Sequence, residues 1–138
     1  MDIASLCTEP PLSHDELAVV NAFLHALDAN DLVTLVRLFA PDAQVNDQLR
    51  NFWGRDEIAL WLDREIIGAK VRLVPRDVRK HYDVVLVTAE ISGNFEAPPL
   101  AQPMVVDLHF TVRGSGIVRL LVLLARTDHP EPEIRRVP

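Results

Sequence analysis

The sequence has little of three things that mark particular classes of protein. It contains a single cysteine, Cys7, so neither an intramolecular disulfide nor a cysteine-rich zinc cluster can form. Its net charge is −6, so it lacks the basic surface that a nucleic-acid partner requires. It also lacks an apolar run of membrane-spanning length, and a basic start followed by an apolar run. We therefore expect a cytoplasmic protein with no membrane partner and no signal peptide.

Several signatures of catalysis are missing as well. No two histidines share a spacing that would hold a metal ion, such as four residues apart on a helix. The chain has no glycine-rich phosphate loop, no Gly-x-Ser-x-Gly elbow and no Ser/His/Asp arrangement. We therefore expect no metal site and no cofactor.

What the chain does have is enough apolar sequence for one folded domain. It is 138 residues long and 49% of them are hydrophobic, which suits a single domain with a real core. We expect a flexible N-terminal arm over residues 1–12 and one domain over residues 13–128. Residues 129–138 contain three prolines and are expected to form an extended tail.

The first half of the sequence has helical periodicity in three segments. Ser13 and Glu16 have the spacing of a capping box, and an apolar stripe follows it as far as Leu27. Asp31 can cap a second, short helix that ends at residue 38 or 39. A turn is expected over residues 40–43, a short strand over 43–48, and a third helix over 55–67.

The second half changes to the alternation of β-strands. A long strand begins at Val71, and Pro75 within it indicates an edge position or a bulge, because proline cannot donate to a ladder. Further strands are expected over residues 84–92, 104–113 and 117–126. The sequence Gly114–Gly116 joins the last two as a hairpin. The order of elements predicts an α+β fold in which three helices cover one face of a curved, mainly antiparallel sheet.

The last of these strands is apolar on both of its faces. Strict alternation places Ile117, Leu121 and Leu123 on one face, and Val118, Leu120, Val122 and Leu124 on the other. Antiparallel sheets usually expose one face to water, and no helix is left to cover the second one. The sequence therefore predicts a homodimer formed through the outer face of the sheet.

Several local strings, taken with this order of elements, resemble the nuclear transport factor 2-like (NTF2-like) superfamily, whose members include ketosteroid isomerases, SnoaL-type polyketide cyclases and non-catalytic binding proteins. The resemblance runs from Asp15 to about Thr127 and looks closest to bacterial SnoaL-like proteins. It implies a cone-shaped fold whose helices and concave sheet face enclose a pocket. The strings are Ala26-Leu27-Asp28-Ala29-Asn30-Asp31-Leu32, Leu38-Phe39-Ala40-Pro41-Asp42-Ala43, Trp53-Gly54-Arg55-Asp56-Glu57-Ile58 and Gly114-Ser115-Gly116-Ile117-Val118.

The pocket implied by this resemblance is apolar and suits a flat, hydrophobic small molecule. Large or β-branched side chains fall on the faces that are turned toward the helices. The expected lining consists of Phe23, Trp53, Trp61, Val85, Val87, Leu108 and Phe110.

Asp47 is the leading candidate for a catalytic residue. In Val45-Asn46-Asp47 it matches the place where ketosteroid isomerases carry their general base. A carboxylate in an apolar cavity loses hydration, which raises its pKa and makes it a better proton shuttle. The oxyanion donors of those isomerases have no counterpart, because their tyrosine position is Phe23 and their acid position is Leu108. A steroid isomerase is therefore not expected, and an Asp47 that faces solvent or caps a loop is the alternative.

Asp107 and His109 form the runner-up arrangement. They flank Leu108 on the same strand, so they reach the cavity only if the strand register slips by one residue. Without that slip they lie on the outer face. A histidine acting together with Asp47 would suit the acid–base pairs that SnoaL-like cyclases use.

Two functions stay open from the sequence. The first is a cofactor-independent isomerase, cyclase, dehydratase or hydrolase that acts on a hydrophobic small molecule with Asp47 as general acid or base. The alternative is a non-catalytic small-molecule binder or dimeric interaction module with the same fold. A second titratable or donor group within reach of Asp47 would favour the enzyme.

Overall fold

A computed structural model of the chain describes residues 3–7, 11–94 and 104–125. The predicted tail over 129–138 therefore lies outside the described residues. In chain order the elements are η1 (Ile3–Leu6), α1 (His14–Asp28), α2 (Leu32–Arg37), β1 (Phe39–Asp47), β2 (Arg50–Trp53), α3 (Gly54–Trp61), the π-helix η2 (Leu62–Ile67), β3 (Arg72–His81), β4 (Val84–Ser92), β5 (Met104–Arg113) and β6 (Gly116–Ala125).

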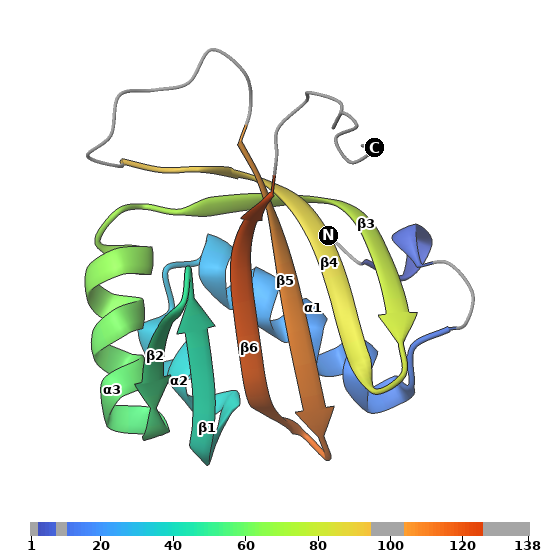
Figure 1. The fold of residues 1–138 in the computed structure, drawn as a ribbon, viewed down its shortest axis with the longest axis horizontal. Coiled ribbons are helices and arrows are strands. Elements are labelled where there is room, and N and C mark those ends of the chain that lie inside the picture. The colour runs from blue at the N-terminus through green and yellow to red at the C-terminus, as the bar shows by residue number, and fades with distance from the viewer. Residues whose placement is uncertain (1–2, 8–10, 95–103, 126–138) are drawn as a thin grey trace, which may run out of the picture.

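The strands form one six-stranded sheet in the order β2-β1-β6-β5-β4-β3. Neighbours are antiparallel except for β1 and β6, which run parallel. The helices lie on one side of this sheet, with α1 crossing behind its central strands (Figure 1). This confirms the predicted α+β fold of three helices on a curved, mainly antiparallel sheet.

The core lies between α1 and the inner face of the sheet. On β4, Val85, Val87 and Ala89 are fully buried, as the alternation predicts. Phe110 of β5 packs edge-to-face against Phe23 of α1, with ring centroids 5.3 Å apart. This contact fixes α1 over the middle of the sheet.

Pro75 has both of the features that its sequence context predicts. The strand that contains it, β3, is an edge strand, and its register with β4 shifts between Pro75 and Asp77. The missing N–H of proline therefore breaks no ladder in the interior of the sheet.

The predicted faces of β6 were wrong at Ile117, because the strand contains a bulge. Thr111 pairs with Arg119, whereas Val112 pairs with Ile117, so Val118 is one residue extra in β6. A bulge reverses the alternation on one side of it. Ile117 is consequently fully buried on the same inner face as Leu120.

The sequence did not reveal β2, and it placed a turn over 40–43 where β1 has already begun. From Phe39 to Gln44 the strand β1 advances by five residues, while β6 advances by only two, from Ile117 to Arg119. Proline and aspartate therefore mark a bend within β1, which then continues into a tight hairpin with β2.

The N-terminal residues that the structure describes are packed rather than extended away from the domain. Ile3 is fully buried, and its N–H donates to Asn21 Oδ1 at 3.0 Å. Cys7 forms an isolated parallel bridge with Val78 of β3. Part of the segment expected as a flexible arm thus covers the edge of the sheet beside α1.

Glu16 combines two roles at the start of α1. The capping box with Ser13 is present as predicted, and the carboxylate also binds Lys80 Nζ at 2.9 Å. Burial alone would raise the pKa of Glu16. The Ser13 backbone N–H and the Lys80 ammonium outweigh that effect and hold the pKa below its ordinary value.

This ion pair predicts a pH-dependent contribution to stability. A carboxylate with a lowered folded-state pKa stabilises the fold above its unfolded-state pKa, and this stabilisation disappears as pH falls through the folded-state pKa. We expect Lys80→Met to lower the free energy of unfolding by about 2 kcal/mol at neutral pH. The difference from wild type should shrink in acid. Urea titrations across the acid range measure both; a constant difference would contradict the assignment.

Candidate functional site

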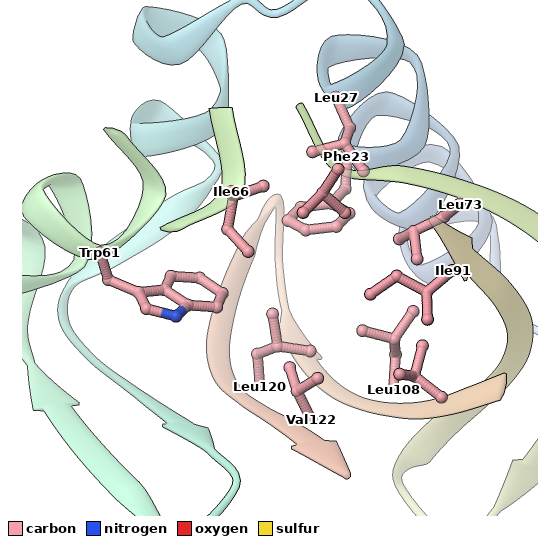
Figure 2. A pocket seen from close by; sticks show the side chains of 11 residues that line it. Phe23, Leu27, Trp61, Ile66, Leu73, Ile91, Leu108, Leu120 and Val122 are labelled. Carbon is pink, nitrogen blue, oxygen red and sulfur yellow. The ribbon is translucent and has the colours of Figure 1, made fainter. Parts of the chain in front are cut away.

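A small cavity of about 30 Å³ lies between α1, the α3–η2 helix and the inner face of the sheet. Its lining is apolar, and the sole side-chain nitrogen or oxygen that it includes is Nε1 of Trp61 (Figure 2). The lining residues are Phe23, Leu27, Trp61, Ile66, Val71, Leu73, Ile91, Val106, Leu108, Leu120 and Val122.

Of the pocket residues expected from the sequence, Phe23, Trp61 and Leu108 line this cavity. Val85, Val87 and Phe110 are fully buried in the core but are not part of the lining. Trp53 lies at the N-cap of α3 with 58% of its surface exposed, away from the cavity.

The sequence did not identify the lining residues that come from η2 and from the start of β3. Ile66 and Leu73 project into the cavity from opposite sides in Figure 2. Their apolar spacing was visible in the sequence. Apolar spacing distinguishes an inward face from an outward one, but it does not show where the inward side chains leave a cavity between them.

Asp47 lies on the cavity-facing side of the sheet. It follows the buried Ala43 and Val45 at spacings of two, and it pairs with Val122, which lines the cavity. Asp47 itself is not in the lining. Its Oδ2 accepts a hydrogen bond from Trp61 Nε1 at 2.9 Å, so Trp61 connects the carboxylate to the cavity wall.

Arg50 and Glu65 complete a charged cluster around Asp47. Nη2 of Arg50 is 3.3 Å from Asp47 Oδ2, and the same guanidinium binds both carboxylate oxygens of Glu65, at 2.6 and 3.0 Å. The hydrogen bonds from Arg50 hold the pKa of Glu65 below its ordinary value. Glu65 likewise raises the pKa of Arg50, so the cluster carries two carboxylates and one permanent cation.

Aromatic rings support this cluster from the side of β2. The guanidinium of Arg50 lies over the ring of Phe52, 5.4 Å from its centroid. Phe52 in turn stacks on Trp61, with centroids 5.9 Å apart. Arg50, Phe52 and Trp61 therefore form one layered arrangement that orients the indole toward Asp47.

The hairpin between β1 and β2 holds Asp47 and Arg50 opposite each other, and its turn is strained. Its two loop residues, Gln48 and Leu49, have φ angles of 52° and 73°. Asn-Gly is the usual sequence for such a turn, which explains why Gln48-Leu49 was not recognised as a hairpin turn. The Gln48 side chain offsets part of the strain, because Nε2 donates to Val122 O at 3.1 Å and Oε1 accepts from Leu124 N at 3.1 Å.

Relief of this strain should stabilise the protein. Leu49 is 80% exposed, so Leu49→Gly removes few contacts while it removes the steric cost of a positive φ. After the added entropy of glycine in the unfolded chain, we expect a gain of about 1 kcal/mol in the free energy of unfolding. Leu60→Gly, at a half-exposed position in α3, is the control and should cost about 1 kcal/mol. Urea denaturation measures both, and a loss at residue 49 would contradict the strain.

Asp107 and His109 lie on the outer face of the sheet. The register pairs Leu108 with Val122 and places Asp107 opposite Leu123. Asp107 Oδ1 accepts a hydrogen bond from Thr88 Oγ1 at 2.7 Å, within that outer face. The structure therefore does not bring either residue together with Asp47.

Metal-ligand groups and membrane-spanning helices are both absent from the described residues. No group of three His, Cys, Asp or Glu side chains among them could hold a metal ion. Within the same part of the chain, no helix has the length and apolar character needed to cross a membrane. Among the described residues, Asp47 is the carboxylic acid that is hydrogen-bonded to a side chain of the cavity wall.

Comparison with known proteins identifies the family. A family model of the SnoaL-like domain matches residues 20–120, which is most of the chain. The chain belongs to the SnoaL-like family. No curated protein matches it.

Solved structures of similar proteins have the NTF2-like fold that the sequence predicts. A candidate polyketide cyclase from Sinorhizobium meliloti is 29% identical, covers 77% of this chain and 94% of its own, and superposes with a TM-score of 0.68. An NTF2-like protein from Cytophaga hutchinsonii is 13% identical over 86% and 95% of the two chains, with a TM-score of 0.64. SalBIII, an epoxide hydrolase/cyclase-like enzyme of pyran ring formation in salinomycin, is 16% identical over 78% and 88%, with a TM-score of 0.68.

Proposed function

We propose that this SnoaL-like protein binds a hydrophobic small molecule in its cone and acts on it as a cofactor-independent isomerase, cyclase, dehydratase or hydrolase. Asp47 is the general acid or base. The observation that carries the proposal is the hydrogen bond from Trp61 to Asp47, because it joins a carboxylate on the inner sheet face to a wall of the apolar cavity.

The surroundings of Asp47 suit proton transfer. Its side chain is only 15% exposed, so a ligand that fills the cavity would largely exclude water from it. Arg50 and Trp61 supply two donors that orient the carboxylate. A ligand reaches Asp47 by displacing the indole N–H, and it then gives a proton to Oδ2 or takes one from it.

The chemistry of similar proteins supports the same reaction class. The Sinorhizobium meliloti protein is a candidate polyketide cyclase, and SalBIII is an epoxide hydrolase/cyclase-like enzyme. Ring closure and epoxide opening both need a proton to be removed from one oxygen or carbon atom and delivered to another. One carboxylate held beside an apolar cavity can serve such a transfer without a cofactor.

A ligand screen with an Asp47 variant tests this function. Thermal unfolding is followed in the presence of flat hydrophobic ketones, lactones and epoxides, for wild type and for Asp47→Asn. A ligand that binds the folded state raises the melting temperature. We expect at least one such ligand to be turned over by wild type, and turnover to fall about 100-fold or more in the variant.

Asp42→Asn is the matched control, because Asp42 is an exposed aspartate on the same strand. It should leave both binding and turnover unchanged. A ligand that stabilises wild type and Asp47→Asn equally, with no turnover by either, would remove Asp47 from a catalytic role.

A non-catalytic binder is the second candidate function, and one observation favours it. Every residue that lines the cavity is apolar apart from the indole nitrogen, and Asp47 is not among them. A site that only holds a hydrophobic molecule needs no more than this. Binding without turnover in the same screen is the result that this candidate predicts.

We propose in addition that the protein forms a homodimer through the outer face of its sheet. Leu86, Leu121 and Leu123 lie on this face and are only partly buried by the protein's own residues. Across it, Leu86 and Leu121 are the two neighbours of His109, so two leucines lie on either side of a histidine at the centre of the face. A bacterial origin and a cytoplasmic location remain predictions from the sequence.

Sedimentation equilibrium tests the dimer. We expect wild type to sediment as a dimer and Leu121→Asp to sediment as a monomer, since the new charge would be buried without a partner. Leu60→Asp places the same charge on the exposed surface of α3 and should leave the dimer intact. A monomeric wild type would contradict the proposal.

A further inference from the structure

A second hollow lies beside the cavity. It is a surface groove of about 240 Å³ between the last turns of α1 and the first half of the edge strand β3. Three of its lining residues, His25, Asp28 and Arg72, are polar or charged. The others are Leu24, Leu73, Val74 and Pro75.

The groove and the cavity share one wall, which is the side chain of Leu73. On α1 the two hollows use adjacent positions, because Leu24 lines the groove whereas Phe23 and Leu27 line the cavity. In Figure 2 Leu73 lies at the edge of the cavity, next to Ile91 and on the side of α1. Leu73 is partly exposed, so its side chain has room to adopt another rotamer between the two spaces.

The volumes indicate how a ligand would be divided between them. Pockets for small molecules typically measure roughly 300–1,000 Å³. The cavity, at about 30 Å³, holds only a small part of such a molecule, whereas the groove offers about 240 Å³. A narrow chain that crosses at Leu73 would use both spaces.

Arg72 gives the groove a group that recognises a specific kind of polar end. In the described part of the chain, both hydrogen bonds of its guanidinium come from Nη1, to Val71 O at 2.9 Å and to Asn30 Oδ1 at 3.3 Å. The opposite edge, Nε with Nη2, has the geometry that binds a carboxylate through two parallel N–H···O bonds. Asp28 lines the same groove and would repel that carboxylate, so it limits the affinity.

We propose that the α1–β3 groove is the entrance and head-group site of the cavity. It takes an alkyl carboxylate, with the carboxylate at Arg72 and the chain passing Leu73 into the apolar cavity toward Trp61. This rests on the ligand-binding part of the proposed function and not on the catalytic role of Asp47. It narrows the ligand class from hydrophobic molecules in general to amphipathic acids.

The experiment uses the two tryptophans of the chain, Trp53 and Trp61. Trp53→Phe leaves the cavity tryptophan as the only one, and its fluorescence is titrated with 10-bromodecanoate, whose terminal bromine quenches a nearby indole. We expect saturable quenching. The apparent Kd should rise about tenfold in Arg72→Gln and by less in Arg72→Lys, which keeps the charge but not the fork. It should fall several-fold in Asp28→Asn.

Two controls separate the head group from the chain. 10-Bromodecan-1-ol carries the same chain without the charge, and its Kd should respond to neither Arg72→Gln nor Asp28→Asn. Arg37→Gln removes an exposed arginine from the end of α2 and should leave the Kd of the acid unchanged. Opposite effects of the variants at residues 72 and 28 cannot come from a general loss of folding.

Three results would overturn the proposal. If the acid and the alcohol bind equally, or if the Kd of the acid does not change in Arg72→Gln, the groove is not a head-group site. Binding without quenching of Trp61 means that the chain does not enter the cavity. Failure of the acid to bind, while ketones or epoxides still raise the melting temperature, refutes this site and leaves the proposed function standing. Arg72-dependent quenching that Asp47→Asn does not change supports this site, whatever the catalytic outcome.

Discussion

The parallel pairing of β1 with β6 is the constraint on which the site depends. It joins the N-terminal hairpin to the last strand of the chain, and it alone places Asp47 beside Val122 on the inner face. The Gln48 side chain secures the end of this pairing through its two hydrogen bonds to the backbone of β6. Without the β1–β6 pairing, β2 would no longer be part of the sheet. The packing of Phe52 on Trp61 would then lose its support.

The charged cluster illustrates how a short helix segment can serve two surfaces. In the π-helix η2, Glu65 faces Arg50 at the outside while its neighbour Ile66 lines the cavity. Single π-turns are wider than α-turns and occur often at functional sites. The same turn therefore supplies Ile66 to the cavity wall and Glu65 to the arginine that contacts Asp47. A change in its conformation would affect the apolar packing and the ion pair together.

The sequence predicted the architecture well because each signal came from local physics. The capping box at Ser13, the alternation in β4 and the Gly114–Gly116 hairpin need no information from distant parts of the chain. The bulge at Val118 and the hairpin at Gln48 were not predicted from the sequence, for the opposite reason. Both are conformations that neighbouring strands impose on residues with no preference for them.

The candidate site was predictable only in part. A pattern shows that Trp61 and Leu108 face inward, but not that Val85 is covered by packing while Ile66 meets an empty space. Trp53 illustrates the limit: its large apolar side chain suggested a pocket, yet its place at the start of α3 exposes it. Arg50, Phe52 and Glu65 join Asp47 through contacts between β1, β2 and η2, which no spacing along the chain encodes.

The extra residue in β6 separates two regular stretches of the strand. Ile117 pairs with Val112 before it and Arg119 pairs with Thr111 after it, so Ile117 and Leu120 both face inward although they are three positions apart. Beyond Arg119 the alternation is unbroken: Leu120 and Val122 line the cavity, while Leu121 and Leu123 form part of the outer surface. Loss of Val118 would therefore leave every leucine on its present face, whereas loss of one residue from the regular stretch, with the pairing before it kept, would exchange the two sets that follow. The strand thus tolerates a change of length at its bulge, but not within the segment that separates the cavity from the outer surface.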